Sequence, residues 1–165
     1  MDDLAVGLLL LFTASRSHAQ EVFLDYGLGV FGSAKESPAE IKTIGLGYRG
    51  EFYNGFYWQL KTEYWVGGPS DLGRNGGFYI ATGPTVLVDL KPVEVRLGAG
   101  FGAISNPDDY LGGSFPQFNE ELYFGVRDKY GKGVGLRLEH VSSAGIYQPN
   151  RGREFVTLEI STKWH

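Results

Sequence analysis

Three side chains near the C-terminal end of the sequence could carry out nucleophilic ester chemistry: His140, Ser142 and Glu154. Ester hydrolysis at neutral pH needs a hydroxyl nucleophile, a base beside it and an acid that orients the base. Residues i and i+2 of a β-strand point to the same face, so an extended segment would place His140 beside Ser142. Glu154 would have to return on a following strand. Spacing alone does not establish a triad, because triads are recognised by their geometry.

The composition indicates a single β-rich domain. The chain has 165 residues, of which 25 are glycine and 15% are aromatic, and it contains no cysteine. The absence of cysteine excludes disulfides and thiolate metal sites. The net charge of −4 is scattered along the chain, without the basic block that a nucleic-acid partner or a polybasic membrane patch would require.

The N-terminal segment resembles a secretory signal. Leu4–Ala14 is an apolar run too short to cross a bilayer as a helix, and Ser17–Ala19 places small residues before a cleavage point. We therefore expect a signal peptide over residues 1–19 and a barrel domain over residues 20–165. Asp2-Asp3 stands where such signals usually carry basic residues, and an N-terminal helix that stays attached is the alternative.

From Val22 onward the apolar residues alternate with period 2, which is typical of β-strands. Each of the eight alternating segments is about ten residues long, as a tilted strand needs to span a bilayer. Pro84 interrupts the fourth segment, and we expect it at a bulge, where its missing N–H is tolerated. The expected strands lie near Val22–Phe31, Ile41–Phe52, Phe56–Val66, Phe78–Val88, Val93–Gly102, Asn119–Arg127, Val134–Glu139 and Val156–Lys163.

The two strand faces differ in polarity, and this difference favours an all-β, eight-stranded antiparallel transmembrane β-barrel of the outer membrane. One face is apolar, and the other carries glycines and charges of both signs, as a small polar lumen would. A soluble lipid-binding barrel, with the charged face outside, is the alternative. The charged face contains Arg49, Glu51, Lys61, Glu63, Glu94, Arg96, Glu121, Arg127, Arg137, Glu139, Glu159 and Lys163.

The connections between the expected strands alternate in length. Tyr53-Asn54-Gly55 has the Asn-Gly signature of a tight hairpin, and the connections at Asp89–Pro92 and Asp128–Lys132 are also short. The other connections are longer. Outer-membrane barrels place short turns in the periplasm and long loops outside, so this alternation favours the membrane interpretation.

The parity of the last two strands assigns a face to the candidate triad. His140 and Ser142 continue the apolar parity of Leu138, and Glu154 continues that of Val156. The three side chains are therefore expected on the lipid face, beside a long outer loop at the level of the outer leaflet. A histidine and a glutamate facing lipid are costly unless they partner each other and serve a function.

With this pattern, the chain resembles the outer-membrane lipid A 3-O-deacylases of the PagL type. The resemblance covers the strand layout, and its specific motif lies in the last two strands and their loop. The motif consists of His140-Val141-Ser142, Ala144-Gly145-Ile146, Pro149-Asn150 and Glu154.

The resemblance implies Ser142 as nucleophile, His140 as general base and Glu154 as orienting acid. It implies Asn150 and backbone N–H groups near Ser143 and Gly145 as oxyanion or positioning groups. Ser143 stands where the family often has asparagine, so a side-chain role there is in doubt.

The implied reaction is hydrolysis of the ester-linked 3-hydroxyacyl chain of lipid A, the lipid part of lipopolysaccharide. This reaction implies no metal and no organic cofactor. The implied location is the outer membrane of a Gram-negative bacterium, with membrane lipids as further partners and a homodimer left open. A non-catalytic structural or adhesive barrel is the second alternative.

Overall fold

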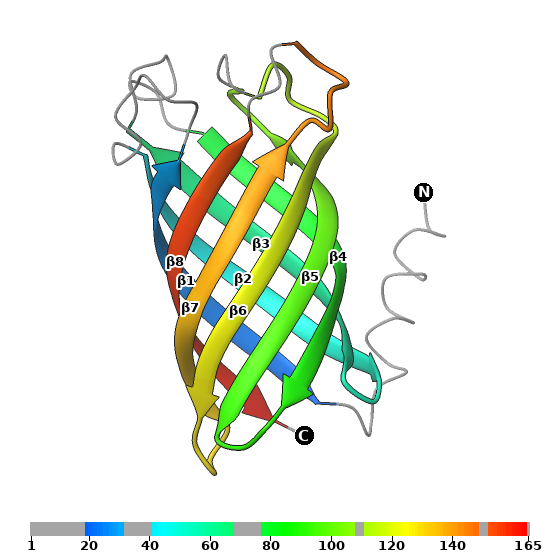
Figure 1. Ribbon diagram of the computed structural model, residues 1–165, viewed down its shortest axis with the longest axis vertical. Helices are drawn as coiled ribbons and strands as arrows, with labels where there is room; N and C mark the ends of the chain where they lie inside the picture. The colour runs from blue at the N-terminus through cyan, green and yellow to red at the C-terminus, as the bar shows by residue number, and fades with distance from the viewer. Residues whose placement is uncertain (1–18, 32–40, 68–76, 108–110, 149–151, 165) are drawn as a thin grey trace, which may run out of the picture.

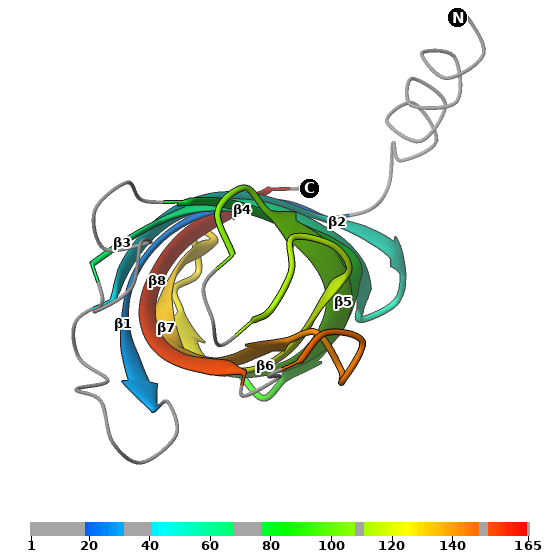
Figure 2. The ribbon, with the colours of Figure 1, turned by 90° about the horizontal axis from the view of Figure 1, so that it is seen from above.

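The computed structural model is a closed antiparallel barrel of eight strands. It describes residues 19–31, 41–67, 77–107, 111–148 and 152–164. Each strand pairs with its neighbours in sequence, and β1 pairs with β8 to close the sheet (Figures 1 and 2). Closure leaves no sheet edge with unpaired backbone groups. The strands are β1 Gln20–Phe31, β2 Lys42–Tyr53, β3 Phe56–Val66, β4 Gly77–Asp89, β5 Val93–Ile104, β6 Gln117–Arg127, β7 Lys132–Ser142 and β8 Arg153–Trp164.

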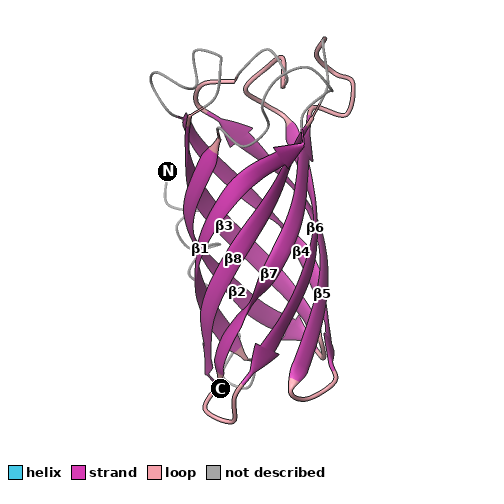
Figure 3. Ribbon diagram, turned by 60° about the vertical axis from the view of Figure 1, so that its left-hand side comes forward, coloured by secondary structure: helices cyan, strands magenta, loops and turns pink. Residues whose placement is uncertain are grey.

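This architecture confirms the predicted eight-stranded barrel. The strand ends that the long connections join lie at one end of the barrel and the short turns at the other, and the described part of the chain is drawn as strand and loop only (Figures 1 and 3). Within those ranges, no helix is both long and apolar enough to cross a membrane. The predicted signal segment lies outside the described residues except for Ala19, and its removal stays a prediction.

The outer face of the barrel is apolar. Outward side chains such as Leu24, Leu97 and Ile160 are about 60% exposed, and they recur at every second position of their strands. A soluble barrel would bury these side chains in its core and expose the charges. The observed arrangement is the reverse, so it excludes the soluble barrel and matches a lipid-facing surface.

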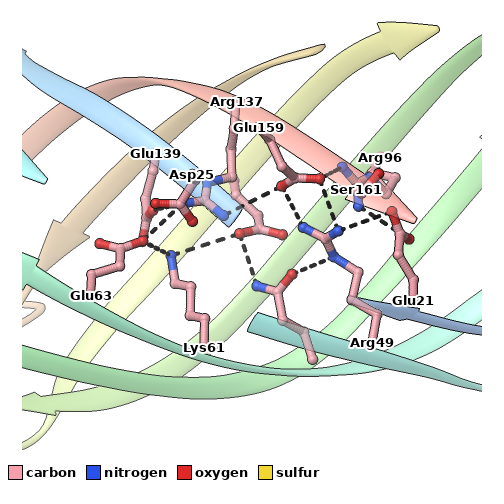
Figure 4. A network of polar contacts seen from close by, with 12 residues as sticks. Glu21, Asp25, Arg49, Lys61, Glu63, Arg96, Arg137, Glu139, Glu159 and Ser161 are labelled. Atoms are coloured by element: carbon pink, nitrogen blue, oxygen red, sulfur yellow. Dashed lines mark hydrogen bonds and ion pairs between the residues drawn. The ribbon is translucent and has the colours of Figure 1, made fainter. Parts of the chain in front are cut away.

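The middle of the lumen holds a network of buried charges (Figure 4). Arg49 donates to both carboxylate oxygens of Glu159, at 2.9 and 2.6 Å. Arg137 donates to Asp25 at 3.0 Å and to Glu63 at 2.8 Å. Buried charges are tolerated when opposite charges and hydrogen bonds satisfy them, so removing one partner is expected to destabilise the barrel strongly.

The part of the lumen nearest the outer ends of β7 and β8 is lined by apolar side chains. This differs from the sequence prediction, which gave a polar interior for the whole barrel. Trp65 packs against Phe155 and Tyr79, with ring centroids 4.7 and 5.0 Å away. Ile41, Ile104, Leu111, Val141 and Ala81 complete this apolar cluster. The alternation along a strand predicts which side chains point inward. It does not predict how polar and apolar inward side chains are distributed along the barrel axis. The cluster lies directly behind the ends of β7 and β8, and it supports their backbone from inside.

Pro84 does not sit at a bulge, so that expectation is wrong. Thr82 pairs with Phe101 and Thr85 pairs with Gly98, which is one continuous register on both sides of the proline. The neighbouring Gly83 lies so close to β5 that a Cβ there would overlap the carbonyl oxygen of Ala99. A local gap in the ladder, with a glycine beside it, accommodates the missing N–H without an inserted residue.

Candidate functional site

The pairing of β7 with β8 brings His140 and Glu154 together. Their Cα atoms are partners in the antiparallel register, so both side chains project from the same face as direct cross-strand neighbours. Nδ1 of His140 donates a hydrogen bond to Oε1 of Glu154, at 2.9 Å. The two side chains are 38% and 41% exposed, whereas Glu139, Val141 and Phe155 point into the lumen and are buried. The pair therefore lies on the outer face, as the parity predicts.

This hydrogen bond indicates the tautomer of the neutral imidazole. An ionised carboxylate can only accept a hydrogen bond, so the proton lies on Nδ1 of His140. In the neutral ring Nε2 is then the acceptor nitrogen. Glu154 thus holds the imidazole in the tautomer that a general base needs, with its basic nitrogen turned away from the carboxylate.

Ser142 is the last residue of β7, and it shares the outward parity of His140. It is half-buried, and its Cα is paired with that of Phe118 in β6. Among the contacts of the described residues, no hydrogen bond joins Ser142 directly to His140. Nucleophile and base are often further apart in the absence of substrate and approach each other when it binds. The alternation of β7 places both side chains on the outer face, two residues apart along the strand.

A tight turn follows Ser142. The N–H of Ile146 donates to the carbonyl of Ser143 at 3.0 Å, and the central residues Ala144 and Gly145 have φ values of +51° and +81°. Positive φ at both central positions is typical of a type I′ turn. Glycine adopts this conformation freely, but for Ala144 it is strained, and such strain concentrates at functional sites.

The predicted positioning residues have different surroundings. Ser143 is fully buried, while Gly145 is exposed and has open space where a side chain would begin. Asn150 lies outside the described residues. The roles assigned to these residues and to His140, Ser142 and Glu154 stay predictions.

Successive rows of outward side chains cross the strands around the site. Ala99, Glu120, His140 and Glu154 form one row across β5, β6, β7 and β8. The row toward the short turns is apolar, and it contains Leu97, Leu122, Leu138 and Val156. A groove of about 570 Å³ runs along these rows on the outer face. A polar row above an apolar groove suits a substrate with a polar head and an acyl chain.

Two residues of this site, Glu120 and Gly152, were not identified from the sequence. Glu120 is an exposed carboxylate in register with His140, and it has no hydrogen-bond or ion-pair partner among the described residues. The sequence feature that could have identified Glu120 is a charged residue at a position of the apolar face, between Phe118 and Leu122. Gly152 is buried against the imidazole of His140. Only its place two residues before Glu154 could have drawn attention to it.

In the described part of the chain, no group of three or more His, Cys, Asp or Glu side chains is placed to hold a metal ion. The chemistry available to the described side chains is thus a hydroxyl, an oriented imidazole and a carboxylate. This set is sufficient for nucleophilic attack on an ester.

Comparisons with known proteins identify relatives of the whole barrel and of its site. The family model described as lipid A 3-O-deacylase (PagL) matches residues 42–163, a range that contains the candidate site. The lipid A deacylase PagL of Pseudomonas aeruginosa is 31% identical over 109 residues, which are 62% of this chain and 61% of that protein. The match thus spans about three fifths of that relative's length.

Solved structures show the same fold. The crystal structure of the outer membrane enzyme PagL superposes with a TM-score of 0.66 and 22% identity, over 86% of this chain and 98% of that one. Neisserial surface protein A superposes with a TM-score of 0.60 and 13% identity, over 89% of this chain and 96% of that one. These similarities support the barrel fold, and the family model matches well over half of the sequence. The chain therefore belongs to the lipid A 3-O-deacylase (PagL) family.

Proposed function

We propose that this protein hydrolyses the ester-linked 3-hydroxyacyl chain at position 3 of lipid A. The observation that carries the proposal is the hydrogen bond between His140 and Glu154, at 2.9 Å, on the same outward face as Ser142. Family membership supports the reaction class, because the matched range contains all three residues. The lipid-facing position of the site supports a substrate that resides in the membrane.

The reaction begins with Ser142. Its Oγ attacks the ester carbonyl carbon while Nε2 of His140 takes the hydroxyl proton, and Glu154 stabilises the imidazolium that forms. The tetrahedral intermediate collapses as His140 returns that proton to the departing sugar oxygen, which leaves the acyl chain on Ser142. Water, deprotonated by Nε2 of His140, then attacks the acyl carbonyl carbon, and His140 returns that proton to Oγ of Ser142 as the fatty acid leaves.

The turn after Ser142 is the proposed oxyanion region. The Ile146 N–H is already used within the turn, where it donates to the carbonyl of Ser143. We assign the developing negative charge to backbone N–H groups of Ser143 and Gly145, with Asn150 as a positioning residue. One such donor contributes about 3–4 kcal/mol to transition-state stabilisation in a well-studied serine hydrolase.

The groove is the proposed binding site for the acyl chain. Leu122 and Leu138 lie one row from His140 toward the short turns, so an acyl chain directed into the groove would bury its apolar surface there. The carboxylate of Glu120 at the same level accepts hydrogen bonds only, so it would favour a hydroxyl or an amide N–H of the substrate. A phosphate would be repelled.

The proposed location is the outer membrane, with the site in the outer leaflet. This orientation places the long connections outside and the short turns in the periplasm. A homodimer stays a prediction, and cross-linking of the protein in membranes would test it.

Fatty-acid release from purified lipid A tests the proposal, with the refolded protein in detergent micelles. Ser142→Ala and His140→Ala should each abolish release, and the double variant should be little worse than either, because triad members act as a unit. Ser114→Ala, which changes an exposed serine of the β5–β6 connection, is the matched control and should keep full activity. Normal release by folded Ser142→Ala would refute the proposal and leave a structural barrel as the better account.

A further inference from the structure

Gly152 lies directly before β8, next to the site. The register of β7 with β8 ends at Val141 and Arg153, and Ser142 and Gly152 are the residues that come next to this last pair on the two chains. A side chain at residue 152 would project against the imidazole of His140.

Contacts at Gly152 show how little space the imidazole leaves there. A Cβ on Gly152 would lie 2.5 Å from Cε1 and 3.1 Å from Nε2 of His140. The first distance is far below van der Waals contact, so the ring would have to move. Because Nδ1 of the ring is hydrogen-bonded to Glu154, a shift of the imidazole would disturb that hydrogen bond.

The backbone at this position also favours glycine. Gly152 has a φ of +66°, in the left-handed region that residues with a side chain rarely adopt. Other glycines of the barrel share this conformation without touching the site. Gly55, in the short turn between β2 and β3, has a φ of +76°, and a Cβ there would contact only the Leu87 carbonyl oxygen, at 3.1 Å.

From these contacts we propose that Gly152 is a positioning residue for the reaction, which keeps the Nε2 edge of His140 open to Ser142 and to the ester. This inference rests on the proposed function and adds a residue to it. Glu154 fixes the imidazole through Nδ1, and Gly152 fixes it by contact at Cε1. The two contacts together restrict the ring that, in the proposed reaction, receives the proton of Ser142 at Nε2.

Two substitutions separate the missing side chain from the backbone conformation. Gly152→Ala adds a Cβ and also strains the backbone. Gly152→Asn adds the same Cβ, but asparagine tolerates positive φ, so the strain is relieved. Gly55→Ala is the matched control, because it imposes similar backbone strain at the opposite end of the barrel.

The measurements are kcat and KM for lipid A, and the rate at which a fluorophosphonate labels Ser142 in the refolded full-length protein. Both Gly152 variants should lose about 100-fold in kcat, the typical effect of displacing a catalytic group by about 1 Å. KM should stay unchanged, and labelling should slow in parallel with kcat. Gly55→Ala should match the unsubstituted protein in both assays.

The outcomes that would contradict the role of Gly152 differ from those that would contradict the proposed function. Full activity in Gly152→Asn with loss in Gly152→Ala would assign the effect to backbone strain and overturn the proposal. Failure of both variants to fold, seen as loss of the heat-dependent gel shift, would also overturn it, because a contact with a half-exposed ring does not hold a barrel together. If Ser142→Ala is inactive while both Gly152 variants are fully active, only the role of Gly152 falls. An active Ser142→Ala would refute the proposed function itself.

Discussion

Replacing Glu154 by alanine should separate catalysis from stability. The substitution removes the hydrogen bond that Oε1 accepts from His140 at 2.9 Å, while both side chains are more than a third exposed. An exposed polar pair of this kind contributes at most about 1 kcal/mol to folding, so the free energy of unfolding should hardly change. In well-studied serine proteases, loss of the orienting acid of the triad lowers kcat by about 10⁴-fold, and each tenfold corresponds to about 1.36 kcal/mol of transition-state stabilisation. The kcat of Glu154→Ala should fall by about this factor.

The assay combines initial rates of fatty-acid release with heat-dependent gel mobility of the same samples. Glu154→Gln should resemble the alanine variant, since an amide can donate to Nδ1 and so favour the wrong tautomer of His140. A residual rate above that of Ser142→Ala is expected, because the nucleophile and base are still present. An unchanged rate in Glu154→Ala would refute the orienting role of the carboxylate. Loss of activity together with a large loss of stability would mean that the pair is structural.

Further predictions concern the barrel around the site. Arg137→Gln breaks contacts with several buried carboxylates, so it should lower the free energy of unfolding by about 3–5 kcal/mol. Urea titration in micelles would measure this change. Leu138→Lys places a charge in the groove, so KM for lipid A should rise while gel mobility shows a folded barrel. An unchanged KM would argue against the groove as the acyl-chain site. Glu120→Gln should change KM for lipid A more than for a short-chain ester, and equal effects would exclude substrate recognition by this carboxylate. A tag inserted at Gly112 should be labelled on intact cells and one at Asn54 should not; the reverse pattern would invert the orientation.

Strand alternation predicted most of the fold and the face of the site. In a small barrel every strand has one lumenal and one outer face, so the polarity of alternate residues gives both the strand and its orientation. The same parity predicted that His140 and Glu154 share the outer face, and the register of β7 with β8 confirms that they meet.

The features that could not be predicted from the sequence depend on contacts between strands. Glu120 belongs to the site because β6 pairs with β7 at His140, and a local pattern does not contain that register. Gly152 matters because the imidazole lies against it, and a glycine carries no side-chain signal of such a contact. The apolar cluster around Trp65 was missed for a related reason, since side chains from most of the strands meet only after closure.

In the proposed function, Ser142 on the lipid face removes the 3-linked acyl chain from lipid A. Mass spectrometry can compare lipid A from cells that produce the protein with lipid A from cells that produce Ser142→Ala at equal level in the membrane. We expect loss of one ester-linked 3-hydroxyacyl chain from lipid A only in cells with the unsubstituted protein. Identical lipid A in the two strains, or deacylation that persists with Ser142→Ala, would refute the assignment of Ser142 as the nucleophile of a lipid A deacylase.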